Sequence, residues 1–235
     1  MARNANTRYF NARLTKAEII AGWCYLPFYL VLLSVLLQHL FRALQIPLDS
    51  IVLNIAYFSV NLAAVLLIFH NFLRQRFFGE SFWEFLQACI LGFVFYQAGT
   101  WAVQFAVTKL GGTLEIYNND TVEGMVLQNR YVMLAISVVL APVIEETLLR
   151  GLVFGSIRAA SRPMAYITSI FIFTMMHNWQ YFVLYPFGSM LLRCLAYVPA
   201  SAALCWTYEK AGTIWAPITI HAIINAISFG IVVLP

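Results

Sequence analysis

Apolar residues form long runs along this chain, separated by short polar or proline-containing segments. Seven runs are present, at about 19–41, 51–73, 82–108, 131–157, 164–178, 187–208 and 213–233. A helix needs roughly 20 residues to cross the hydrocarbon core of a bilayer, and most of these runs have about that length. Helices satisfy their own backbone hydrogen bonds in lipid. The pattern therefore predicts an all-α fold, a polytopic membrane helix bundle with about seven transmembrane helices.

The composition supports a membrane protein rather than a soluble one. Hydrophobic residues make up 62% of the 235 residues and charged residues 10%, whereas a soluble domain typically carries about 25% charged residues. Seven spans leave no room for a second domain, so we expect a single membrane domain over 1–235. Within it, residues 1–129 hold three spans and an acidic outer loop, and the site residues discussed below fall in 130–230.

The net charge of +4 raises the question of a nucleic-acid partner. No basic patch with interleaved aromatic residues is present, so none is expected. A cytoplasmic amino terminus places nine basic residues on the inner side: Arg3, Arg8, Arg13, Lys16, Arg74, Arg76, Arg158, Arg162 and Lys210. Three fall on the outer side: Arg42, Lys109 and Arg130. Because basic residues favour the cytoplasmic side, this asymmetry predicts an integral, multi-pass protein with its amino terminus in the cytoplasm. The outer loop with Glu115, Asp120 and Glu123 is then extracytoplasmic.

The adjacent carboxylates of Glu145 and Glu146 lie inside the fourth apolar run. Ionisable residues are expensive in hydrocarbon, so a pair of them indicates a functional site. Glu146 and Arg150 are four residues apart, a spacing at which a carboxylate and a guanidinium meet on one helix face. One carboxylate is enough to neutralise Arg150, which leaves Glu145 as the candidate for chemistry. The alternative is that both glutamates only neutralise Arg150 within the bundle.

Two later runs add polar side chains at a similar depth. His177 lies one turn after Phe173, and His221 and Asn225 share one helix face. At about 1.5 Å per residue, Glu145, His177 and Asn225 are roughly 20 to 22 Å from the inner ends of their helices, and His221 roughly 16 Å. Interhelical hydrogen bonding is the alternative role for such residues. The shared depth favours a buried site built from three helices.

These residues resemble the three motifs of a known family, the CPBP (CAAX protease and bacteriocin-processing, Abi) family of intramembrane endopeptidases. The motifs are Glu145-Glu146-x-x-x-Arg150, Phe173-x-x-x-His177 and His221-x-x-x-Asn225, in that order, and Trp215-Ala216-Pro217 is also similar to the family. The resemblance covers roughly 130–230. The first three spans carry no such motif.

The resemblance implies an intramembrane endopeptidase that hydrolyses a peptide bond in a membrane-associated or lipid-linked protein or peptide. Glu145, assisted by His177, would activate a water molecule. His221 and Asn225 would stabilise the oxyanion. Glu146, Arg150 and Phe173 would support these groups, with Arg150 holding Glu146.

Other functions are weighed against this one. Two histidines and a glutamate, namely His177, His221 and Glu145, could bind zinc and leave a position open for water. The chain lacks the His-Glu-x-x-His spacing of zinc peptidases, so we favour a site without metal or other cofactor. A non-catalytic bacteriocin-immunity or scaffold member is also possible. A small proton-coupled transporter is a further alternative, which an inverted repeat would favour, and the sequence shows no such repeat.

The basic asymmetry gives a direct prediction about topology. Alkaline phosphatase is active only outside the cytoplasm, so a fusion after Asp120 is expected to be active and a fusion after Arg76 silent. Fusion protein levels on immunoblots serve as the control. The opposite pattern of activity would reverse the orientation.

Overall fold

The fold is described by a computed structural model, which covers residue 10 and residues 12–112 and 124–233, with side chains through 230. The described residues form helices and no strands, which confirms the all-α prediction. The predicted acidic outer loop with Glu115, Asp120 and Glu123 lies outside the described residues, as do Arg3 and Arg8.

The first three predicted spans correspond to five α-helices and one π-helical turn. The first span is one long helix made of α1 (Lys16–Pro27), the π-helical turn η1 (Phe28–Leu32) and α2 (Leu33–Ala43). The next elements are α3 (Ser50–Ile68), the short α4 (His70–Leu73) and α5 (Phe82–Lys109).

The fourth span is a helix interrupted by π-helical segments. It comprises α7 (Arg130–Leu134), η2 (Ala135–Leu140), α8 (Ala141–Glu146), η3 (Thr147–Phe154) and α9 (Gly155–Arg158). The chain continues with α10 (Arg162–Asn178), a 3-10 turn η4 (Trp179–Tyr181), α11 (Phe187–Ala211) and α12 (Trp215–Val233).

Helices occupy all seven predicted ranges, and five of them are long and apolar enough to cross a membrane. These five are Lys16–Ala43, Ser50–Ile68, Phe82–Lys109, Arg130–Arg158 and Phe187–Ala211. The helix α10 has 17 residues, and the apolar part of α12 is Trp215–Gly230; both are shorter. The protein is an integral membrane protein, while the predicted count of seven spans rests on these two shorter helices.

Several helix ends are set by the polar residues that separate the apolar runs. Thr15 and Glu18 form a capping box at the start of α1, and the side chains of Asp49 and Ser161 accept hydrogen bonds from the first turns of α3 and α10. Gly212 ends α11 with φ 65°, a left-handed conformation that glycine adopts without strain. Capping residues in the sequence therefore mark these helix ends.

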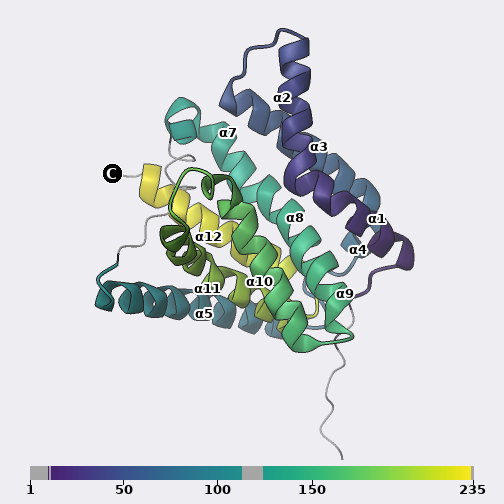
Figure 1. Ribbon diagram of the computed structural model, residues 1–235. Coiled ribbons are helices and arrows are strands. Elements are labelled where there is room, and N and C mark those ends of the chain that lie inside the picture. The colour runs from purple at the N-terminus through teal and green to yellow at the C-terminus, as the bar shows by residue number, and fades with distance from the viewer. Residues whose placement is uncertain (1–9, 11, 113–123, 234–235) are drawn as a thin grey trace, which may run out of the picture.

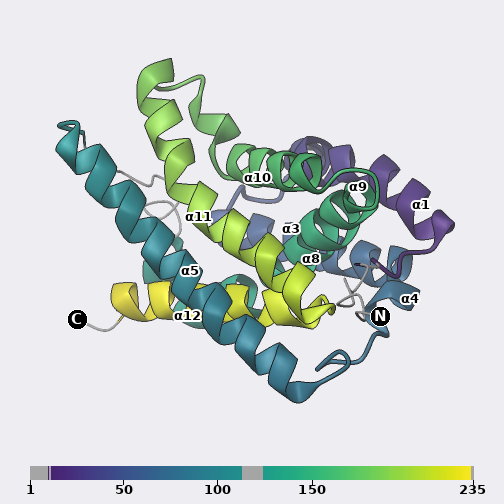
Figure 2. The same cartoon turned by 90° about the horizontal axis from the view of Figure 1, so that it is seen from below.

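The interrupted helix Arg130–Arg158 lies at the centre of the bundle (Figure 1). In its most apolar stretch, 56% of the residues are buried, against 11–33% in the other candidate spans. Its segments contact α1 and α3 on one side and α10, α11 and α12 on the other. Figure 2 shows α5 running along α11, with α12 beside both. This arrangement surrounds Glu145 and Glu146 with helices.

Close packing around the central helix depends on two glycines. A Cβ atom on Gly22 of α1 would lie 2.6 Å from Cζ of Phe69, and one on Gly151 of η3 would lie 2.7 Å from Cε1 of Phe72. Both phenylalanine rings are buried in the main apolar core. Small residues allow such close approach between membrane helices.

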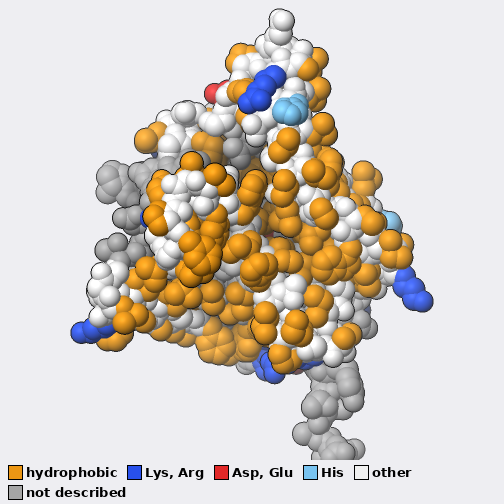
Figure 3. All heavy atoms as spheres, in the orientation of Figure 1, with side chains coloured by type: hydrophobic (Ala, Val, Ile, Leu, Met, Phe, Trp, Pro, Cys, Tyr) orange, Lys and Arg blue, Asp and Glu red, His pale blue; other side chains and the backbone are white. Residues whose placement is uncertain are grey.

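On the outside of the bundle, hydrophobic side chains cover most of the face in Figure 3, and lysine and arginine lie at its margins.

An ion-paired cluster joins the ends of three helices at the side predicted to be cytoplasmic. The carboxylate of Glu209 on α11 binds the guanidinium groups of Arg158 and Arg162 and accepts a hydrogen bond of 2.9 Å from the hydroxyl of Tyr166. The cluster links α9, α10 and α11 where the chain reverses direction.

The glycine packing generates a stability prediction. Gly151→Ala places a methyl group against the buried Phe72 ring, and overpacking of this kind typically destabilises by about 1–3 kcal/mol. We therefore expect a lower thermal unfolding temperature in detergent. Gly188→Ala is the matched control, because nothing lies within 4 Å of a Cβ there. Equal unfolding temperatures for the two variants would contradict the packing described.

Candidate active site

The two glutamates sit at the end of α8, a short α-helical segment between the π-helical segments η2 and η3. Pro142 lies in the first turn of α8 and has no backbone N–H to give to the preceding turn. π-Helical turns within α-helices occur frequently at functional sites. Both carboxylates are buried: Glu145 is 7% exposed and Glu146 0%.

Glu146 accepts hydrogen bonds from two side chains. Its Oε1 accepts hydrogen bonds from Nη1 of Arg150 at 2.8 Å and from Nδ1 of His221 at 2.7 Å. Arg150 in turn donates from Nη2 to Oγ of Ser201 at 2.9 Å, and its guanidinium lies 4.5 Å from the ring centre of Phe173. The structure therefore contains the predicted Glu146–Arg150 pair, and it extends this pair to α10, α11 and α12.

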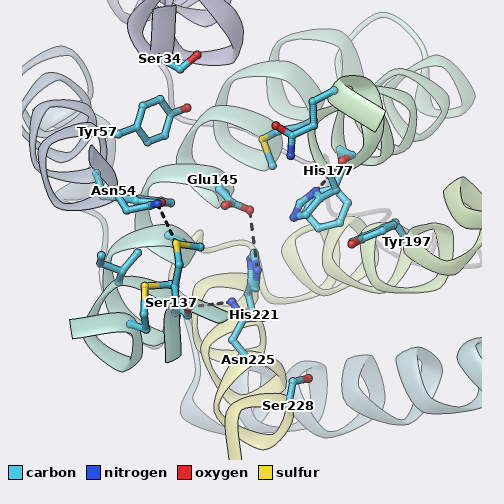
Figure 4. A pocket seen from close by; sticks show the side chains of 18 of the residues that line it. Ser34, Asn54, Tyr57, Ser137, Glu145, His177, Tyr197, His221, Asn225 and Ser228 are labelled. Atoms are coloured by element: carbon cyan, nitrogen blue, oxygen red, sulfur yellow. Dashed lines mark hydrogen bonds and ion pairs between the residues drawn. The ribbon is translucent and has the colours of Figure 1, made fainter. Parts of the chain in front are cut away.

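Glu145 faces the other side of the same imidazole ring. Its Oε2 lies 4.0 Å from Nε2 of His221 and has no hydrogen-bond partner among the described side chains and backbone. Figure 4 shows this carboxylate directed toward His221 in the pocket. A separation of 4.0 Å is too long for a direct hydrogen bond but suits a bridging water molecule. His221 thus stands between the two carboxylates.

His177 is fixed by its own helix and by two aromatic rings. Its Nδ1 lies 2.8 Å from the backbone oxygen of Phe173, and its ring stacks on Tyr197 with centroids 4.7 Å apart. A carbonyl oxygen only accepts hydrogen bonds, so Nδ1 carries the proton and Nε2 keeps its lone pair. In Figure 4, His177 lies across the pocket from Glu145. The lone pair is therefore available to a group in the pocket.

Asn225 completes the set on α12, one turn after His221. Its Nδ2 donates a hydrogen bond of 2.8 Å to the backbone oxygen of Ser137 in η2 (Figure 4). This bond uses one of the two amide hydrogens and fixes the orientation of the carboxamide. The second hydrogen can serve a ligand.

The four residues predicted to be catalytic line one pocket of about 610 Å³. They are Glu145, His177, His221 and Asn225. Of the predicted supporting residues, Phe173 also lines the pocket, whereas Glu146 and Arg150 lie behind it. The volume falls in the usual range for binding pockets of small ligands, roughly 300–1,000 Å³. The other wall comes from η1, α2 and α3, the helices in which the sequence showed no motif.

The sequence analysis missed several pocket residues. Tyr29, Tyr57 and Tyr197 line the pocket, and Ser201 holds Arg150. The chain contains 12 tyrosines, and aromatic residues are common in membrane proteins at the interface. No spacing rule distinguishes these three from the others. Their position along helices at the depth of Glu145 was the only available signal.

The metal alternative can be compared with the donor geometry. Among the described residues, no group of three or more histidine, cysteine, aspartate or glutamate side chains is arranged to hold a metal ion. Glu145, His177 and His221, the set considered for zinc, line the pocket without forming such a group.

Comparison with known proteins finds one family model that is similar to part of the chain. Residues 127–227 match the family model described as type II CAAX prenyl endopeptidase Rce1-like. No curated protein and no solved structure matches the chain. The matched range contains all three motifs and runs from just before α7 into α12, leaving out α1 to α5. Over residues 127–227, this membrane protein is similar to the Rce1-like CAAX endopeptidases, which agrees with the resemblance of its motifs to the CPBP family.

Proposed function

We propose that the protein is an intramembrane endopeptidase that cleaves a peptide bond in a membrane-associated or lipid-linked substrate by glutamate-activated water. The observation that carries the proposal is the burial of the Glu145 carboxylate without a hydrogen-bond partner for its Oε2. Its Oε2 is buried, has no hydrogen-bond partner among the described residues, and faces the pocket 4.0 Å from Nε2 of His221. A buried carboxylate oxygen without a partner is unfavourable unless a ligand satisfies it.

The proposed first step is proton transfer from water to Glu145. A water molecule in the pocket donates one hydrogen bond to Oε2 of Glu145 and the other to Nε2 of His177. As the water oxygen attacks the substrate carbonyl carbon, its proton passes to Glu145. A general base must lie within hydrogen-bond reach of the proton that it removes, and general base catalysis typically contributes about 10² to 10⁴ in rate.

The second part of the proposal concerns the oxyanion. Attack forms a tetrahedral intermediate with a negative oxygen, and donors aimed at that oxygen lower the barrier. The free amide hydrogen of Asn225 is one donor. Nε2 of His221 is the proposed second donor, on a ring that Glu146 holds in place at Nδ1. The C–N bond then breaks, and Glu145 returns its proton to the leaving nitrogen, giving an amine and a carboxylic acid.

Glu146 and Arg150 have a positioning role in this scheme. They do not line the pocket, so neither touches substrate. Glu146 fixes the ring of His221 through the bond at Nδ1, and Arg150 compensates the buried charge of Glu146. Removing one partner of a buried ion pair is strongly destabilising, because the other charge is left uncompensated.

The substrate class follows from the setting of the pocket. The matching family model is named for prenylated CAAX substrates, which are lipid-linked peptides. Apolar helices form the pocket walls, so a substrate held by a lipid group reaches the site from the membrane. Two internally quenched peptides test this point, one with a prenylated cysteine near its carboxy terminus and one unmodified. Faster cleavage of the prenylated peptide supports a lipid-linked substrate.

The role of Glu145 is tested by Glu145→Gln. Glutamine keeps the shape of the side chain but cannot take a proton from water, so we expect peptide cleavage to fall by at least about 10². Glu80→Gln makes the same chemical change at an exposed carboxylate paired with Arg13 and is expected to retain full activity. Both variants are compared after size-exclusion chromatography in detergent. Normal turnover by Glu145→Gln would refute the mechanism.

The role of Asn225 separates oxyanion stabilisation from metal binding. Removing one oxyanion donor usually lowers kcat by about 10² to 10³, so Asn225→Ala is expected to be slow but measurable, with KM little changed. Metal content is measured by mass spectrometry, and activity is followed with and without a strong chelator. Stoichiometric zinc, with activity lost to the chelator and restored by added zinc, would replace the proposed mechanism with a metal-dependent one.

A further inference from the structure

Tyr29 brings a phenol to the pocket from a helix outside the region matched by the family model. It lies on the π-helical turn η1, two residues after Pro27, and it is 2% exposed. It lines the same pocket as Glu145 and His177. Tyr29 belongs to none of the three motifs, and its contacts indicate its role.

The hydroxyl of Tyr29 has an unusually weak hydrogen-bond acceptor. It donates to Sδ of Met176 at 3.3 Å, and a thioether sulfur accepts hydrogen bonds only weakly. Two neighbouring tyrosines have strong oxygen acceptors. Tyr57 donates to the backbone oxygen of Tyr29 at 2.7 Å, and Tyr25 donates to Oδ1 of Asn61 at 2.6 Å. Tyr57 lines the pocket as well, but of these three phenols only that of Tyr29 donates to sulfur, so a substrate oxygen would be a better acceptor than its present one.

The position of the phenol is fixed before any ligand binds. The bond from Tyr57 ties the backbone of η1 to α3, and the rings of Tyr29 and Tyr57 lie 6.0 Å apart. Met176, which accepts this hydrogen bond, also lines the pocket and precedes His177 on α10. A donor held in this way needs little rearrangement to reach a substrate oxygen.

We infer that Tyr29 is an additional catalytic residue, whose hydroxyl leaves Met176 Sδ and donates a hydrogen bond to the carbonyl oxygen of the substrate's scissile peptide bond. This inference rests on the proposed endopeptidase function. Hydrogen bonds to charged acceptors are roughly twice as strong as those between neutral groups, so the exchange of sulfur for oxygen gains most when the oxygen becomes an oxyanion. An interaction that strengthens in the transition state raises kcat.

The first experiment compares two variants that each remove one phenol hydroxyl from α1 or η1. Tyr29→Phe keeps the ring and its packing, and we expect kcat to fall by about 10 to 10² with KM within about twofold. Tyr25→Phe is the control, since Tyr25 does not line the pocket. It leaves buried Oδ1 of Asn61 without its donor and is expected to lower the unfolding temperature while kcat changes less than twofold.

The second experiment measures binding without turnover. In the Glu145→Gln background, the affinity for the cleavable peptide is compared with and without Tyr29→Phe, by fluorescence anisotropy. A donor to the oxyanion leaves this affinity within about twofold. A tenfold loss of affinity would assign Tyr29 to ground-state binding and overturn the inference.

The remaining outcomes are also distinct. Unchanged kcat in Tyr29→Phe, or an equal loss in Tyr25→Phe, would overturn the role of Tyr29 while the endopeptidase proposal stands. If the unaltered protein cleaves neither peptide faster than Glu145→Gln does, the proposed function fails, and the role of Tyr29 fails with it.

Discussion

The structure depends on how two adjacent carboxylates are accommodated in the interior of a membrane helix bundle. Oε1 of Glu146 accepts hydrogen bonds from Arg150 and His221, and Arg150 is anchored in turn by Ser201 and the face of Phe173. Burial of charge on this scale is tolerable only when each ion is paired and hydrogen-bonded. The network joins η3, α10, α11 and α12 around α8, so the helices that carry the motifs assemble through it.

The same network leaves Glu145 unmatched. Arg150 donates its hydrogen bond to Glu146, not to Glu145. Oε2 of Glu145 has no hydrogen-bond partner in the described part of the chain. Oε2 of Glu146 also lacks a partner, but Glu146 has two hydrogen bonds at Oε1, so the two chemically identical side chains differ in their surroundings. One stabilises the bundle and orients His221. The other is left to react with a ligand, which is the basis of the proposed water activation.

The sequence predicted the helices well because lipid imposes one simple rule, that backbone polar groups be satisfied within a helix. Capping residues such as Thr15 and Asp49 also marked where helices begin. The Glu146–Arg150 contact followed from helical spacing. The π-helical segments around α8 did not, because no periodicity in the apolar run distinguishes them from α-helix.

Contacts between helices were the part that single-sequence reasoning could not supply. The bond between His221 and Glu146 joins residues 75 positions apart, and equal depth in the membrane says nothing about which side chains meet. Tyr29 and Ser201 were missed for the same reason. The expected oxyanion role of Asn225 is also refined, since one of its amide hydrogens is held by Ser137.

The most direct test of the account is a structure of the protein bound to a phosphinate peptide, a stable mimic of the tetrahedral intermediate. The account predicts one phosphinate oxygen within hydrogen-bond distance of Oε2 of Glu145, in the place of the attacking water. The other oxygen is predicted to contact Asn225 and His221. A phosphinate bound through a metal ion, or one that does not touch Glu145, would contradict the account.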